Sequence, residues 1–442
     1  MITYAVTRQF KIFLLAAGDL VAAYASLAAM IALRYRGDEA VMYWRWHTSP
    51  YAIIFGAWLV VLFIVGLYDF HDIRSRLALL TRTGEALAAS ALVSVTLFYA
   101  VPSFRITPKT DLLVLLAVFA VLFVGWRILS MHLFARTIFQ TRVLFLGTAP
   151  EAEGLCAVLA RAPQLGFRCV GVIRELGASV AIPACDTIVV SGLQNGGDAT
   201  TRALYDRFFA SDATVVDYST FHEKITRTVP ESALSEQWIL GNLAARERSM
   251  YDHLKRPLDV VLAVVLAMPA AVLSPLIALA VRLDSPGSVL FRQARVGKGS
   301  RVFRMIKFRT MRTDAEKAGA AFASKNDPRV TRIGRFLRTT RLDEIPQLWN
   351  ILRGDMSFVG PRPERPEFEA ELSKTIPFFP VRHLIRPGLT GWAQVNAAYA
   401  ATAEDHLRKL LWDLYYFKHR SLMLDVAIIL RTVYSVLKRT GR

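Results

Sequence analysis

The chain has 442 residues, of which 53% are hydrophobic, and a formal net charge of +18 from 54 Lys and Arg against 36 Asp and Glu. This length predicts two or three domains, and the mean hydropathy of +0.33 excludes an ordinary soluble protein. The positive charge points to membrane headgroups or anionic substrates, because nucleic acid binding would explain the charge but not the apolar segments.

Four apolar segments in the first third of the chain predict a helical transmembrane region over residues 1–140. Three of them are long enough to cross a hydrocarbon layer of ~30 Å, and the third in chain order is the weakest. The first is too long for the apolar part of a signal peptide and is followed by further spans, so we expect no cleaved leader. The four segments are residues 10–33, 51–68, 85–101 and 112–133.

The basic residues around these segments predict their orientation. Arg8, Lys11 and Arg142 lie near the two ends of the bundle, and the balance of loop charges places both ends in the cytoplasm. Asp19 is an ionisable residue inside the first span. Such a residue is either a functional site or, equally well, a partnered structural group or one close to the membrane surface.

Residues 141–147 form a short apolar strand that ends in glycine, and further strand-like runs alternate with helical sequence. This alternation predicts a small parallel α/β domain over residues 141–250 that resembles a Rossmann fold. The turn at residues 147–150 lacks the later glycines of a dinucleotide fingerprint, and Glu175 falls later than a ribose-binding acid should. We interpret the domain as a degenerate spacer or assembly module, with cofactor binding as the alternative.

The three cysteines of the chain, Cys156, Cys169 and Cys185, all fall within this α/β domain. Their spacing fits no metal-ligand motif. We therefore expect buried, reduced thiols of a cytosolic domain and no disulfide framework.

A fifth apolar run, residues 258–281, opens the C-terminal domain, which we place at residues 251–442. Pro269 and the pair Ser274-Pro275 interrupt this run, and each proline removes a backbone donor and bends a helix. Basic residues stand at both ends of the run, so both ends favour the cytoplasmic side. We therefore predict a re-entrant helix over residues 254–283 with its break at Ser274 and Pro275; the alternative is a kinked fifth span.

Two adjacent carboxylates, Asp343 and Glu344, precede a short stretch with apolar residues at helical spacing. Pro346 is tolerable only if the helix starts there, and Gly354 marks its end. Asp343 and Glu344 should therefore lie at the helix N-terminus, where negative charge is favoured. There they act either as a simple helix cap or as a pair that holds a divalent metal beside a phosphate.

Basic residues surround this pair in the sequence. Lys307 and Arg309 fall on one side of an extended segment, and Pro361-Arg362-Pro363 holds an arginine in a stiff loop suited to phosphate. Arginines also recur every third residue from 329 to 341, and on a helix they cannot all face one ligand, so we single out Arg338. The tail over residues 422–438 is either an interfacial amphipathic helix or a packing helix.

From Lys255 to about Phe417 the chain resembles the polyprenyl-phosphate sugar-phosphate transferases, that is, the bacterial sugar transferase family. Five ordered blocks over about 160 residues make this resemblance highly specific, whereas the N-terminal spans and the α/β module resemble the larger members only in architecture. The blocks are Lys-Arg-Pro-Leu-Asp (255–259), Lys-Phe-Arg-Thr-Met (307–311), Leu-Asp-Glu-Ile-Pro-Gln-Leu-Trp-Asn (342–350), Gly-Asp-Met-Ser-Phe-Val-Gly-Pro-Arg-Pro (354–363) and Arg-Pro-Gly-Leu-Thr-Gly-Trp (386–392).

The resemblance implies an α+β catalytic domain in the bacterial inner membrane, facing the cytoplasm. It implies transfer of a sugar phosphate from a UDP-sugar to undecaprenyl phosphate with release of UMP, as the first membrane step of exopolysaccharide, capsule or O-antigen synthesis. Asp343 would be the nucleophile and Glu344 a ligand of Mg²⁺. The expected substrate-binding residues are Lys307, Arg309, Arg338, Pro361, Arg362 and Pro363.

The resemblance also makes a homodimer the expected assembly and gives nucleic acid no role. Two other functions stay open at this point. One is a glycosyltransferase that releases UDP instead of UMP, and the other is a non-catalytic scaffold of a polysaccharide assembly complex. Loss of function on replacement of Asp343 distinguishes an enzyme from the scaffold.

Overall fold

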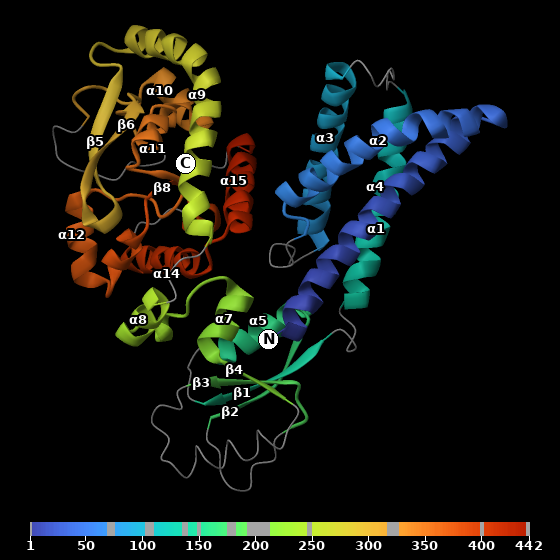
Figure 1. The fold of residues 1–442 in the computed structure, drawn as a ribbon, viewed down its shortest axis with the longest axis horizontal. Helices are drawn as coiled ribbons and strands as arrows, with labels where there is room; N and C mark the ends of the chain where they lie inside the picture. Colours follow the sequence, from blue (N-terminus) through green and yellow to red (C-terminus); the bar gives the residue numbers. More distant parts are fainter. Residues whose placement is uncertain are drawn as a thin grey trace. The chain divides into compact units, whose positions relative to one another are not determined.

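The computed structural model (Figure 1) describes residues 2–68, 76–101, 110–134, 140–147, 152–174, 183–191, 213–244, 250–315, 327–397 and 402–438. These residues form two compact units, Met1–Thr226 and Arg227–Arg442. The first unit holds the four N-terminal apolar helices and the parallel sheet, and the second holds the five sequence blocks of the family resemblance.

Four long helices form the N-terminal region: α1 (Ile2–Arg34), α2 (Asp38–Ile64), α3 (Arg76–Ala100) and α4 (Thr110–Phe134). This confirms the prediction of four apolar helices, and all four are long and apolar enough to cross a membrane. Helix α2 begins much earlier than expected, since Asp38 and Glu39 suit its first turn and Pro50 is accommodated inside it. The apolar pattern alone marks only the span, not the whole helix.

Asp19 is a buried structural partner of Arg127. The two side chains are 1% and 3% exposed, and Arg127 Nη2 lies 2.5 Å from Asp19 Oδ2. Arg127 Nη1 also donates to the carbonyl of Leu67 at 2.7 Å. The pair therefore joins α1 to α4, and through Leu67 it also joins them to the residues that follow α2. These contacts favour the interpretation of Asp19 as a partnered structural residue.

A four-stranded parallel sheet with the order β2-β1-β3-β4 confirms the predicted α/β architecture. Val143, Phe145 and Val189 from the strands pack with Phe221 into one core. Thr148, Ala149, Pro150 and Glu175, on which the alternative of cofactor binding was judged, lie outside the described residues. The elements are β1 (Thr141–Gly147), α5 (Ala152–Arg161), β2 (Phe167–Ile173), β3 (Thr187–Ser191), β4 (Thr214–Asp217) and α7 (Tyr218–Thr226).

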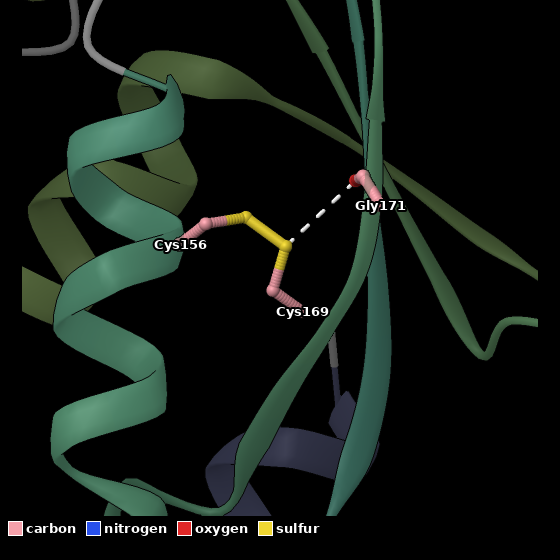
Figure 2. The surroundings of a disulfide bond; sticks show 3 residues. All are labelled: Cys156, Cys169 and Gly171. Atoms are coloured by element: carbon pink, nitrogen blue, oxygen red, sulfur yellow. Dashed lines mark hydrogen bonds between the residues drawn. A yellow bond between two sulfur atoms is a disulfide. The ribbon is translucent and has the colours of Figure 1, made fainter.

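The prediction of three reduced thiols is wrong for two of the cysteines. Cys156 of α5 and Cys169 of β2 form a disulfide (Figure 2), with their Cα atoms 5.5 Å apart, while Cys185 is free. Helix α5 packs directly on β2, and this places the two residues within disulfide distance. The spacing of cysteines along a chain does not report such a through-space contact.

The second unit combines an antiparallel hairpin, a short parallel strand pair and several helices, as expected of an α+β domain. The hairpin is β5–β6, and β7 pairs in parallel with β8. The elements are α8 (Glu236–Ala244), α9 (Met250–Asp284), β5 (Leu290–Val296), β6 (Val302–Phe308), α10 (Arg332–Thr340), α11 (Gln347–Arg353), β7 (Ser357–Val359), α12 (Pro366–Thr375), β8 (Gly388–Thr390), α13 (Trp392–Asn396), α14 (Ala403–His419) and α15 (Leu422–Leu437).

Residues 227–244 belong to this second unit together with the five sequence blocks. Val229 is fully buried among Ile376, Phe379, Leu410 and Leu414. Its amide also donates to the carbonyl of Leu411. The segment that follows α7 in sequence therefore forms part of the core beneath α14.

Helix α9 is 35 residues long and stays helical through Ser274 and Pro275, so a gap between two helices is not present. Figure 1 shows that α9 nevertheless changes direction in its C-terminal part. Its C-terminal half packs through Ile277 and Val281 against Phe308 of β6 and a leucine of α10. Much of its remaining surface is apolar and exposed.

Candidate active site

The two carboxylates lie in a single 3₁₀ turn, Leu342–Glu344, between α10 and α11. Arg341 enters the turn in a left-handed conformation with φ of 59°, which reverses the chain after α10. Pro346 then occupies the N-cap position of α11, where its missing N–H removes no helical hydrogen bond. Asp343 and Glu344 therefore precede the helix, in the place that the sequence predicts.

Asp343 is 7% exposed and has no hydrogen bond or ion pair within the described part of the chain. Burial and, to a smaller extent, the neighbouring Glu344 raise the pKa of its carboxyl to about 6, against the lowering effect of Lys307, Arg341 and Arg338. The carboxylate is thus surrounded by cations but directly neutralised by none of them. Such a group is ionised above pH 6 and poorly solvated.

Glu344 shares the site but is held differently. Its Oε1 lies 3.3 Å from Arg341 Nη1 and 3.8 Å from Lys307 Nζ. Burial alone would raise its pKa, but Lys307, Arg362 and Arg341 together hold the pKa of Glu344 below its ordinary value. The pKa values of the two neighbouring carboxyls are therefore shifted in opposite directions, which is typical of acidic pairs with separate chemical roles.

Lys307 comes from β6, and a side chain on α11 fixes its position. Asn350 accepts from the amide of Ile306 at 3.1 Å and donates to the carbonyl of Arg304 at 2.9 Å. These bonds lock β6 against α11, so Lys307 faces the carboxylate turn. Burial lowers the pKa of Lys307 to about 8, against the raising effect of Glu344.

Arg338 and Arg309 have different surroundings. Arg338 donates from Nε to Thr310 Oγ1 at 2.9 Å and lies close enough to Asp343 to interact with its charge. Arg309 is 7% exposed and donates to the carbonyls of Ser285 and Pro286 at 2.6 and 3.0 Å. Its guanidinium thus fastens the turn after α9, and these contacts are structural.

The predicted stiff loop Pro361-Arg362-Pro363 follows β7 and is fixed through its backbone. The amide of Gly388 donates to the carbonyl of Pro361 at 2.9 Å. Arg295 donates to the carbonyl of Pro363 at 3.0 Å. The guanidinium of Arg362 has no hydrogen bond or ion pair among the described residues, and its charge reaches Glu344 and Lys307. The loop therefore brings an uncommitted cation to the carboxylate pair.

A buried polar cluster that the sequence interpretation missed anchors the first turns of α9. Lys255 lies 3.0 Å from Asp259 and 2.8 Å from Asp425 of α15. Tyr251 and Tyr416 both donate to Asp425, at 3.0 and 2.7 Å. The sequence could have indicated the pair of Lys255 and Asp259, because the two residues are one helical turn apart. It could not indicate their partners on α14 and α15.

Arg256, the second residue of the same block, holds the end of α11. It donates to the carbonyls of Ile351 and Leu352 at 2.5 and 2.8 Å. These are carbonyls of the last turn of α11, which have no partner within the helix. The first block of the family motif therefore joins α9 to the helix that follows Asp343 and Glu344.

The donor set of this site fits a magnesium ion that is shared with a substrate. Within the described ranges, no group of three or more His, Cys, Asp or Glu side chains is arranged to hold a metal ion. Mg²⁺ commonly takes only one or two carboxylates and completes its shell with water and substrate phosphates. Asp343 and Glu344 supply oxygen ligands of this kind.

Residues 250–439 match the model of the bacterial sugar transferase family. The chain is 48% identical over 195 residues to a UDP-N-acetylgalactosamine-undecaprenyl-phosphate N-acetylgalactosaminephosphotransferase of Aeromonas hydrophila, which covers 43% of this chain and 45% of that protein. It is 45% identical over 192 residues to a UDP-glucose:undecaprenyl-phosphate glucose-1-phosphate transferase of Caulobacter vibrioides, which covers 43% of this chain and 72% of that protein.

A longer match includes part of the N-terminal unit. The chain is 30% identical over 331 residues to a UDP-glucose:undecaprenyl-phosphate glucose-1-phosphate transferase of Klebsiella pneumoniae, with 67% of each chain covered. The match to the Aeromonas protein, in contrast, spans less than half of that relative. On the family model and on these identities, the chain belongs to the bacterial sugar transferase family.

Proposed function

We propose that this protein transfers a sugar phosphate from a UDP-sugar to undecaprenyl phosphate and releases UMP. The observation that carries the proposal is the unpaired, buried carboxylate of Asp343 among the cations Lys307, Arg338 and Arg341. The names of the relatives from Aeromonas and Caulobacter support the substrate class. This reaction would be the first membrane step in the synthesis of a polysaccharide such as exopolysaccharide, capsule or O-antigen.

The first half of the reaction uses Asp343 as the nucleophile. A carboxylate oxygen attacks the phosphorus that carries the sugar, and a bond forms between them as the bond to the bridging oxygen breaks. UMP leaves with that oxygen and its electron pair. Lys307, Arg338 and Arg362 would bind the phosphate oxygens and offset their negative charge, which is supported by their charge interactions with Asp343 and Glu344.

The second half transfers the phospho-sugar to the lipid. A phosphate oxygen of undecaprenyl phosphate attacks the same phosphorus, and the bond to Asp343 breaks. The carboxylate is thereby regenerated, and the product is a lipid diphosphate sugar. Each half needs Asp343 in a site with little water, because water would hydrolyse the acyl phosphate, and its 7% exposure meets this requirement.

The donor set suits Mg²⁺, with Glu344 as its protein ligand. Bound Mg²⁺ would neutralise diphosphate charge as the carboxylate approaches. Glu344 is suited to this role because Lys307, Arg362 and Arg341 keep it ionised. The paired cations also restrain its carboxylate, so that Asp343 alone stays free for the phosphorus.

The lipid substrate suggests how α9 meets the membrane. We propose that α9 enters one leaflet and returns, with the catalytic unit on the cytoplasmic face of the inner membrane. A straight helix would separate residues 251 and 281 by about 45 Å at 1.5 Å per residue. Tyr251 at one end and Val281 at the other nevertheless both pack into the same unit, as a re-entrant helix requires.

A nucleotide-release assay tests this function. Purified protein is mixed with undecaprenyl phosphate and a panel of UDP-sugars, beginning with UDP-glucose and UDP-N-acetylgalactosamine. We expect UMP with one donor, and loss of UMP release in Asp343→Asn. Release of UDP would instead indicate an ordinary glycosyltransferase, and full complementation of a deletion strain by Asp343→Asn would indicate a scaffold.

A further inference from the structure

Helix α14 presents a lysine toward the loop that carries Arg362. Asp413 of α14 lies 2.8 Å from Arg382 Nη2, and the same nitrogen donates to the carbonyl of Arg362 at 3.0 Å. Lys409 precedes Asp413 by one helical turn, so both side chains lie on the same face of α14. Lys409 therefore faces the Arg362 loop, although it belongs to none of the five sequence blocks of the family resemblance.

Within the described ranges, Lys409 and Arg362 each lack a carboxylate at ion-pair distance. Both side chains are half-buried, and among the described residues neither the ammonium nor the guanidinium forms a hydrogen bond or ion pair. Burial lowers the pKa of Lys409, and the charges of Arg362 and Arg382 lower it further. Two unpaired cations that face each other repel, so their arrangement is favourable only when an anion joins them.

Two carboxylates interact with the charge of Lys409, and neither supplies that anion. Asp413 pairs with Arg382 at 2.8 Å. Glu364 interacts with the charge of Lys409, but its Oε2 lies 3.8 Å from Arg295 Nη1, and its main-chain carbonyl accepts from the amide of Val296. Arg362 in turn interacts with Lys307 beside the catalytic pair. Positive charge thus extends from Lys307, which pairs with Glu344, through Arg362 to Lys409.

We propose that Arg362 and Lys409 together form a subsite for a phosphate oxyanion. The inference rests on the proposed function and extends it to a residue outside the five sequence blocks. Two sources could supply this phosphate, namely the nucleotide half of the UDP-sugar and the head of undecaprenyl phosphate. Both present oxyanions that a guanidinium and an ammonium bind from two sides.

The test compares full-length wild type with Lys409→Met and with the control Arg408→Met. Arg408 is the adjacent residue, is exposed, and in the described part of the chain pairs with the exposed Glu404 at 2.6 Å. We expect Lys409→Met to raise KM at least about tenfold for either UDP-sugar or undecaprenyl phosphate, with kcat within about threefold. The substrate whose KM rises identifies the source. The control should stay within twofold, and Lys409→Arg should restore most of the lost affinity.

Direct binding separates this inference from the proposed function. Affinities for UMP and for undecaprenyl phosphate are measured on the same proteins without turnover, so a result is obtained even if no UDP-sugar is used. Weakened binding of either probe in Lys409→Met supports the subsite. Unchanged affinity for both probes overturns it, and so does an equal loss in Lys409→Arg accompanied by a lower melting temperature.

Discussion

Two buried aspartates in this chain, Asp19 and Asp343, have opposite surroundings. Asp19 is 1% exposed and lies 2.5 Å from Arg127, which is itself held by the carbonyl of Leu67. Asp343 is 7% exposed and has no such partner among the described residues, although Lys307 and Arg338 are near enough to interact with its charge. One carboxylate is fully committed to an ion pair, and the other is kept available.

The difference teaches how burial serves structure in one place and chemistry in another. A buried ion pair fixes two helices, and removal of one partner leaves an uncompensated charge. A buried carboxylate without a direct partner makes folding less favourable but is ready to bond to an incoming phosphorus. The comparison predicts that substitutions at the two aspartates have separate consequences, one on stability and the other on turnover.

Replacing Asp343 by Asn should have the largest effect on turnover. The amide keeps the size of the side chain but removes the nucleophilic oxygen, so we expect UMP release to fall by at least about 10³-fold. The measurement is UMP release at saturating substrates. Asp19→Asn provides the matched control, because the same chemical change in α1 should leave kcat within about threefold.

Replacing Asp19 by Ala should have the largest effect on stability. Arg127 would then be a buried charge without a counter-ion, at a cost of about 3–5 kcal/mol. Thermal unfolding in detergent measures the loss, and the double variant Asp19→Ala/Arg127→Met should recover most of it. If the double variant were no more stable than the single one, the pair would not be the reason for the burial of Asp19.

Replacing Glu344 by Gln should lower activity by about 10²-fold, because in the proposed mechanism Glu344 holds the metal and does not attack the substrate. The change should also raise the Mg²⁺ concentration needed for half-maximal activity. A titration of UMP release against Mg²⁺ measures both effects. A normal Mg²⁺ response in this variant would argue against the role of Glu344.

The pH dependence gives a smaller effect with a definite sign. Asp343 must be ionised to attack and its pKa is raised to about 6, so kcat/KM should fall about tenfold per unit as pH decreases below 6. Activity should not decline on this account above pH 7. A profile of kcat/KM from pH 5 to 8 measures this acidic decline. A flat profile through pH 6 would contradict the role of Asp343 as an ionised nucleophile.

The same raised pKa predicts a gain in stability for Asp343→Asn. The folded carboxyl binds its proton more tightly than the unfolded one does, so ionisation disfavours the folded state above pH 6. The variant should therefore melt about 3 °C higher than wild type at pH 8. This advantage should shrink as the pH falls from 6 toward 4, and it should vanish below the ordinary pKa of an aspartate, where the wild-type carboxyl is protonated in both states.

Much of the fold follows from local patterns in the sequence. The apolar runs predict the four N-terminal helices, and the strand-like runs around Val143 and Val189 predict the parallel sheet. Pro346 and Gly354 mark the two ends of α11. These features depend on neighbours in the sequence, such as proline geometry and helical spacing, so the chain alone reveals them.

Contacts between distant segments were beyond such reasoning. The sequence does not show that Cys156 faces Cys169, that Arg309 binds the carbonyls after α9, or that Asp425 receives Lys255. Each of these partners is chosen by packing between elements and not by spacing along the chain. Composition identified the candidate cations, and only their surroundings distinguish the structural Arg309 from the uncommitted Arg362.

The most direct test of the account is mass spectrometry of protein that has been mixed with a UDP-sugar in the absence of undecaprenyl phosphate. We predict a mass increase of one sugar phosphate, located on the peptide that contains Asp343 and removed when undecaprenyl phosphate is added. An unmodified Asp343 in a preparation that still turns over, together with full activity of Asp343→Asn, would contradict the central claim.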